Sequence, residues 1–192
     1  MPSSSLLSWQ SRSSRVLDQI EAAHKALGGG SAGGRFAAQQ VNHAYVVMLC
    51  SQFQKFSRDL HTECINYLTA PASPPDPRVP ILRNLLVGGR KLDFGNPNPG
   101  NLGSDFGRFG IDFWLGLSIA DPQNRIRQRQ LEQVCNVRNA VAHQDFNPAK
   151  IGKLSIRLAD VRRWRQLCDE LAIAFDRVMG DRLAAIMGNR PW

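Results

Sequence analysis

Two side chains near the end of an expected helix have types and spacing suited to chemistry on phosphate groups. Arg138 and His143 lie five positions apart in the stretch CNVRNAVAH, and Asn139 follows the arginine directly. A guanidinium can bind a phosphate through two parallel hydrogen bonds, and an imidazole exchanges protons near neutral pH. Together they are the minimum for cleaving RNA without a metal ion. A histidine at the end of a helix is also a common surface or capping residue.

Arg138 falls where the helical pattern predicts a buried side chain. The helix is expected from Pro122 to His143, and its apolar stripe consists of Leu131, Val134, Cys135, Val141 and Ala142. At about 100° per residue, Arg138 lies at the centre of this stripe. Burying a guanidinium without a partner is costly. The surroundings of Arg138 must therefore hold a carboxylate or open onto a cleft or a subunit interface.

A second helix, expected from Phe36 to Leu68, supplies candidate carboxylates. Glu63 falls inside the apolar stripe of this helix, and Asp59 falls on its edge. Two interpretations remain open. In the first, Glu63 and Arg138 form a buried ion pair that sets the helix register. In the second, the facing helices build a polar pocket, in which Glu63 and Asp59 support Arg138 and His143.

The remaining pattern is also helical. An N-terminal helix ends at the glycines Gly28–Gly30, and its apolar residues are Trp9, Val16, Ile20, Ala23 and Leu27. Asp121 is the expected N-cap of the helix that begins at Pro122, and a last helix starts near Ala159. The segment KLSIRL is the single strand candidate. The predicted fold class is all-α: an antiparallel four-helix bundle with an extra N-terminal helix and long loops.

Glycine and proline mark the connections between these helices. The expected loops are a linker through residues 31–34, a proline-rich loop from Ala70 to Pro80, and a long Gly/Asn/Pro-rich loop from Asp93 to Gly110. A short helix in ILRNLLVGG separates the last two, and another follows in IDFWLGLSI. We expect one domain over residues 1–192, with an N-terminal helix and linker at 1–34 and a bundle core at 36–187.

Composition narrows the classes of function. Apolar residues make up 43% of the 192 residues, and no run approaches the roughly 18 apolar residues of a membrane span. The four cysteines are scattered without a C-x-x-C pair, which predicts buried thiols in a cytoplasmic protein and neither a zinc site nor another metal or cofactor. The net charge of +8 favours polyanionic partners such as RNA.

The stretch RNAVAH resembles the signature of the HEPN family, which is an arginine followed after four to six residues by a histidine, often with asparagine after the arginine. The resemblance covers roughly Phe36 to Met187. It implies an antiparallel helical bundle with this signature on a late helix. Many HEPN proteins are metal-independent endoribonucleases that act as homodimers, and many serve as toxins of toxin–antitoxin pairs or in phage defence.

Carried over to this chain, the resemblance implies three catalytic residues. Arg138 would contact the scissile phosphate, His143 would move a proton, and Asn139 would orient His143 or the phosphate. RNA, a second copy of the chain and an antitoxin protein are the expected partners, and no membrane is expected. The alternatives are a non-catalytic HEPN-like bundle that binds nucleotide, RNA or a protein, and an unrelated helical interaction protein.

Overall fold

The structure, a computed structural model, describes residues 1–27, 32–70, 76–146 and 155–192. Every regular element within these residues is helical, so the all-α prediction is confirmed. The long helices are α2 (Ser14–Ala26), α3 (Ala32–Leu68), α7 (Asn124–His143) and α9 (Leu158–Met187). The shorter ones are α1 (Ser4–Ser8), α4 (Arg78–Val87), α5 (Pro99–Phe106) and α6 (Phe113–Ala120).

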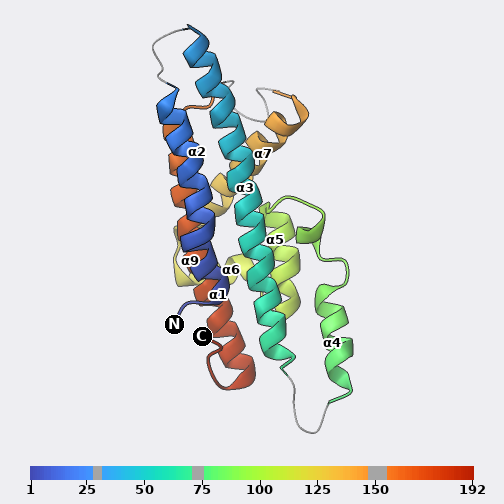
Figure 1. Cartoon of the computed structure of the whole chain (residues 1–192). Coiled ribbons are helices and arrows are strands. Elements are labelled where there is room, and N and C mark those ends of the chain that lie inside the picture. The colour runs from blue at the N-terminus through green and yellow to red at the C-terminus, as the bar shows by residue number, and fades with distance from the viewer. Residues whose placement is uncertain (28–31, 71–75, 147–154) are drawn as a thin grey trace.

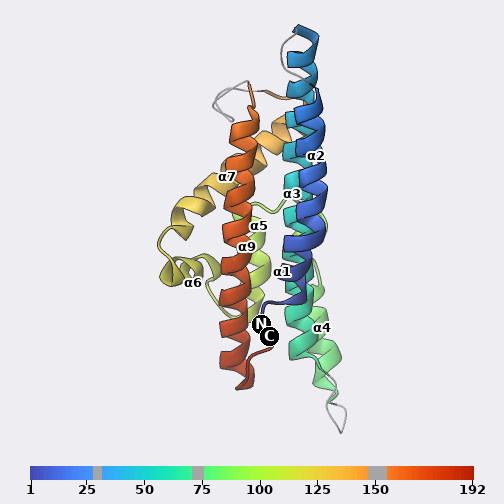
Figure 2. The ribbon, with the colours of Figure 1, turned by 60° about the vertical axis from the view of Figure 1, so that its left-hand side comes forward.

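The long helices α3 and α9 lie side by side and form the centre of the molecule (Figures 1 and 2). α2 packs along α3, and α7 lies obliquely against both α3 and α9. α5 and α6 pack against α7, and α6 also packs against α9. The chain ends lie next to each other in both views, and the N–H of Ser3 donates a hydrogen bond to the Asp176 carboxylate on α9 at 3.0 Å.

The core follows the periodic apolar pattern of α3. Apolar side chains that recur along this helix at helical spacing are buried: Tyr45, Leu49, Phe53, Phe56, Leu60 and Cys64. Aromatic rings from other elements complete the core, with Phe106 stacked on Phe113 at 4.5 Å between centroids and Phe113 edge-on to Phe175 at 4.8 Å. The α5–α6 region thus contributes directly to the core.

The N-terminal helix contains a π-helical turn, Trp9–Ser13, between α1 and α2. A π turn holds one residue more than an α turn and so rotates the buried face that follows it. Trp9 is buried as expected, but the next fully buried side chain is Leu17, whereas Val16 is half-buried and Ala23 and Leu27 are exposed. Trp9 and Leu17 belong to the same hydrophobic core as α3 and α9.

Several expected loops are partly helical. Residues 32–34, assigned to a linker, form the first turn of α3, and Arg78–Pro80, assigned to a loop, begin α4. Pro80 is tolerated there because N–H groups in the first turn of a helix have no helical acceptor. The expected stop at Gly28–Gly30 lies outside the described residues. Of the strand candidate KLSIRL, residues 155–157 are irregular and Leu158 begins α9.

The loop prediction for Asp93–Gly110 is wrong over most of its length. A 3₁₀ turn spans Lys91–Asp93, α5 follows, and a second 3₁₀ turn spans Gly107–Phe109. The Asn98 side chain caps α5 by accepting from the N–H of Asn101, and Pro99 occupies the first turn. An asparagine before a proline is a recognised helix-start signal. The Gly-rich composition of the segment concealed it.

The start of α7 also differs from the prediction. Gln123, not Asp121, precedes the first helical residue, Asn124. Asp121 accepts a hydrogen bond from the Gln123 N–H at 2.9 Å and pairs with Arg127 at 2.5 Å. Asp121 therefore braces the turn before α7 and does not cap the helix itself.

Candidate functional site

The backbone of Arg138 lies in the buried stripe of α7, but its guanidinium lies in a different environment. Its neighbours Leu131, Val134 and Cys135 are buried, whereas Arg138 itself is only half-buried. Among the described residues, no carboxylate lies within ion-pair distance of its guanidinium, and its hydrogen bond runs from Nη1 to the Asn139 Oδ1 at 3.2 Å. The guanidinium thus turns away from the core toward the face that carries Asn139. Most of its N–H groups remain available to a ligand.

The ion pair between Glu63 and Arg138, one of the two interpretations of the sequence, is not formed. α3 and α7 run antiparallel, with the Cys50 thiol 4.0 Å from the Val134 carbonyl oxygen. Glu63 follows Cys50 by more than three helical turns, or about 20 Å of helix axis, in the direction away from Arg138. The two charges therefore lie at different levels of the bundle.

Glu63 instead holds the start of the N-terminal helix. Its carboxylate accepts hydrogen bonds from the N–H groups of Ser4 and Ser5, both at 2.9 Å, and from the Ser5 hydroxyl at 2.6 Å. Burial raises the pKa of Glu63, but these hydrogen bonds outweigh burial and leave its pKa below the ordinary value. Asp59 forms an ion pair with Lys55 one turn away on the same helix. Neither carboxylate is directed to Arg138.

Asn139 links Arg138 to a second asparagine. Its Oδ1 accepts both from Arg138 and from the Asn96 Nδ2, the latter at 2.5 Å. Because arginine can only donate, Asn139 must present its oxygen to Arg138, and Asn96 must present its nitrogen to Asn139. These two hydrogen bonds therefore fix the orientation of both side-chain amides. Among the described residues nothing accepts from the Asn139 amide nitrogen, so its two N–H groups are available to an anion.

The segment that carries Asn96 is firmly braced. The buried Asp105 carboxylate accepts from the N–H groups of Lys91 and Leu92, at 2.9 and 2.8 Å. The Asn101 side chain donates to the carbonyl oxygen of Asn96 at 2.8 Å, and a Cβ on Gly95 would lie only 2.7 Å from that Asn101 amide nitrogen. A side chain at position 95 would therefore push the Asn101 amide away from its contact with Asn96. Sequence reasoning missed Asn96 because the contact joins two distant segments.

His143 is the last residue of α7, and its side chain is exposed. The helix ends there because Gln144 adopts the left-handed conformation, with φ of 56°. The Asp145 N–H then donates to the Ala140 carbonyl at 3.0 Å, which closes the helix in the manner of a Schellman motif. Asn139 and His143 are one turn apart on the same face. Asn139 therefore shares a helix face with His143 and bonds to Arg138.

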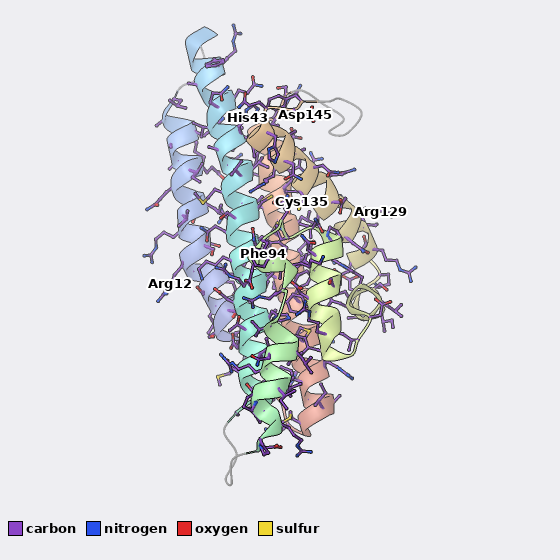
Figure 3. The ribbon with its side chains drawn as sticks, turned by 90° about the vertical axis from the view of Figure 1, so that its right-hand side faces the viewer. Arg12, His43, Phe94, Arg129, Cys135 and Asp145 are labelled. Carbon is purple, nitrogen blue, oxygen red and sulfur yellow. The ribbon has the colours of Figure 1, made fainter. Side chains whose placement is uncertain are left out.

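A second histidine lies close to the end of α7. The His43 ring on α3 stacks on Phe146 with centroids 5.5 Å apart, and Figure 3 shows His43 and Asp145 at the same end of the bundle. The buried His43 Nε2 has no hydrogen-bond partner in the described part of the chain. Burial lowers the pKa of His43 and so disfavours its charged form. His43 anchors the chain beyond His143, and the sequence pattern carried no signal for it.

The other reactive side chains are enclosed. All four cysteines are free and buried, as expected, and burial raises the pKa of the Cys64 and Cys168 thiols well above their ordinary value. Residues 1–27, 32–70, 76–146 and 155–192 hold no cluster of His, Cys, Asp and Glu that could bind a metal ion. No helix in the same ranges is both long and apolar enough to cross a membrane.

Comparison with known proteins identifies the family of the chain. No curated protein and no solved structure matches the chain. A family model described as RiboL-PSP-HEPN matches residues 11–181, which covers most of the helical bundle and the whole of α7. The all-helical fold is consistent with that family. The chain belongs to the HEPN family, in its RiboL-PSP-HEPN branch.

Proposed function

We propose that this protein is a metal-independent endoribonuclease that works as a homodimer. The observation that carries the proposal is the arrangement around Asn139. Arg138 has no carboxylate partner among the described residues, and His143 is exposed one turn beyond Asn139. Structural arginines beside a core are normally paired. An arginine without a carboxylate partner in the described residues, followed on the same helix by an exposed histidine, therefore suits an anionic ligand.

In the proposed reaction, the 2′-hydroxyl oxygen of RNA attacks the adjacent phosphorus. The bond from phosphorus to the 5′-oxygen breaks, which leaves a 2′,3′-cyclic phosphate and a 5′-hydroxyl. Arg138 stabilises the additional charge on the phosphate oxygens, and the N–H groups of Asn139 support it. His143 accepts the proton of the 2′-hydroxyl or donates one to the leaving oxygen.

The requirement for two proton transfers supports a dimer. Near Asn139, one protomer offers one exposed histidine from the described residues, His143. His43 is half-buried with its Nε2 enclosed, burial lowers its pKa, and its ring stacks on Phe146. A second copy of α7 across a shared cleft supplies the second His143. Glu63 and Asp59 take no part in this proposal, because their carboxylates are engaged elsewhere.

The experiment that tests the activity uses purified protein, single-stranded RNA and EDTA. We expect products with cyclic-phosphate ends, and no cleavage when the scissile nucleotide is 2′-deoxy. His143→Ala should abolish cleavage, whereas His24→Ala, a histidine change on α2, should not. Full activity of His143→Ala would overturn the mechanism. RNA that is bound but remains uncut would favour a non-catalytic HEPN protein.

The proposed cellular role is that of a toxin controlled by an antitoxin protein, or of an effector in phage defence. This role follows from membership of a family in which such proteins are common. Expression in a host cell should be toxic, and His143→Ala should relieve the toxicity. A toxic His143→Ala variant would separate any toxicity from RNA cleavage.

A further inference from the structure

One continuous polar stripe runs along the exposed side of α7. Its residues alternate at spacings of four and three, which places them on a single helical face. They are Arg125, Arg129, Glu132, Asn136, Asn139 and His143. The asparagines are half-buried, and the other four side chains are exposed. The stripe connects the candidate site at one end of α7 to two arginines at the other.

The two arginines at the far end differ from their neighbour Arg127. Arg127 is held between Asp121 and Glu170, at 2.5 and 2.6 Å. In the described ranges, no carboxylate comes within ion-pair distance of Arg125 or Arg129, and both are exposed. Within the described part of the chain, the fold thus pairs Arg127 with carboxylates and leaves Arg125 and Arg129 without one.

A surface hollow of about 560 Å³ lies beside these arginines, between α6 and α7. Its lining includes Trp114, Leu115, Ser118, Gln128 and both arginines. The Trp114 indole N–H donates to the Pro99 carbonyl oxygen at 2.8 Å, which holds the ring in place at the wall of the hollow. Asp112 also lines the hollow, but its carboxylate caps α6 by accepting from the Leu115 N–H at 3.0 Å.

A half-buried aromatic ring beside two arginines that pair with no carboxylate in the described residues is a combination that suits single-stranded nucleic acid. Bases stack on the ring without regard to sequence, and arginines bind the backbone phosphates. Along α7, Arg129 and His143 are separated by about 21 Å of helix axis. A strand lying on the stripe would therefore place several nucleotides between the two ends.

We infer that the α6–α7 hollow is a second RNA-binding subsite, which holds the backbone and one base of a single-stranded segment several nucleotides from the scissile phosphate. The inference rests on the proposed function for its substrate class. It assigns the hollow the role of selecting RNA by length and single-stranded character. Glu132, the acidic member of the stripe, repels the RNA backbone between Arg129 and His143 and so weakens binding there.

The test measures binding of a labelled single-stranded RNA to full-length His143→Ala protein, which does not consume the probe. The affinity of the Arg125→Ala/Arg129→Ala double variant is compared across salt concentrations with that of Arg12→Ala/Arg15→Ala. The control removes the same charge from exposed arginines on the N-terminal helix, and Figure 3 shows Arg12 and Arg129 on opposite sides of the molecule.

We expect the Arg125/Arg129 change to make the plot of log affinity against log salt less steep, by the amount that corresponds to about two phosphate contacts. The control should leave this slope nearly unchanged. Lengthening the RNA should raise its affinity for the parent protein but not for the Arg125/Arg129 variant. A single abasic nucleotide at the right distance should lower affinity about five- to a hundredfold. Glu132→Gln should raise affinity severalfold.

Equal losses in the two double variants would overturn the subsite, as would an affinity independent of RNA length. The result is separable from the proposed catalysis. If Arg125 and Arg129 control RNA binding but the wild-type protein cuts nothing, the subsite stands and the nuclease proposal fails. If the wild type cuts RNA and the salt slopes of the variants agree, the nuclease proposal stands and the subsite fails.

Discussion

Glu63 and Arg138 are both charged residues placed by the helical pattern among apolar neighbours, and the fold treats them in opposite ways. Glu63 accepts three hydrogen bonds from Ser4 and Ser5 and ties the N-terminal helix to α3. Among the described residues, Arg138 makes a single hydrogen bond, of 3.2 Å, to its own neighbour Asn139. A charge that the fold has satisfied is structural, whereas a charge left with unused donors is available for a ligand.

The same contrast separates two histidines. His61 on α3 is fully buried, and its Nε2 lies 3.1 Å from the Asp105 carbonyl oxygen. Burial is the main reason that the pKa of His61 falls to about 4. His143 is exposed at the end of α7. Stability should therefore depend on Glu63 and His61, and activity on Arg138 and His143.

The largest expected effect is on catalysis. Arg138→Ala and His143→Ala should each reduce RNA cleavage by about two to four orders of magnitude, because each removes a transition-state contact or a proton-transfer group. The double variant should be no worse than the single ones, since the two residues act as a unit. Single-turnover rates and circular dichroism provide the measurements. Unfolding of Arg138→Ala would instead identify Arg138 as structural.

The second effect is the loss of stability in mild acid. The folded pKa of His61, about 4, lies below its unfolded value of about 6.5, so the unfolded chain binds the additional proton. The stabilisation is thus present above pH 6.5 and lost as the pH falls toward 4, by up to about 3 kcal/mol. Urea unfolding at several pH values measures it. His61→Gln should remove this part of the pH dependence, and His143→Ala should retain it.

Glu63→Gln should lower the free energy of unfolding by about 2 kcal/mol, because the charged acceptor of three hydrogen bonds is lost. The lowered pKa of Glu63 means that its contribution is present above its unfolded pKa and is lost as the pH falls through the folded pKa. The variant should therefore differ least from the wild type in strong acid. RNA cleavage below the melting temperature should be unchanged. A loss of cleavage without a loss of stability would contradict the structural role.

The smallest expected effect tests the link between the two asparagines. Asn96→Ala should reduce cleavage about tenfold, because Asn139 loses the hydrogen bond that orients it. The control is Asn98→Ala, which removes the cap of α5 and should cost about 1 kcal/mol of stability with less effect on cleavage. In an Asn139→Ala background, Asn96→Ala should have no further effect. Additive losses would show that Asn96 does not act through Asn139.

Much of the fold was predictable because it depends on local repetition. Most apolar positions of α3 between Tyr45 and Cys64 are buried as their spacing predicts, whereas Met48 is half-buried. In the N-terminal helix, the apolar pattern predicted that Val16 would be buried, whereas the buried residue is Leu17. The π turn that begins at Trp9 adds one residue, which a count of 3.6 residues per turn does not include. α5 was hidden by composition, although Asn98 and Pro99 carried the signal for a helix start.

The sequence by itself determined that α3 and α7 would be amphipathic helices, and that Arg138, Asn139 and His143 would follow one another near the end of α7. These features depend on the spacing of residues within one segment, which helix geometry converts directly into position. Only the tertiary structure decided the partners of those residues. Glu63 met Ser4 and Ser5 rather than Arg138, and Asn96 met Asn139, because such contacts depend on how helices align over tens of residues. Spacing within a helix carries no information about that alignment.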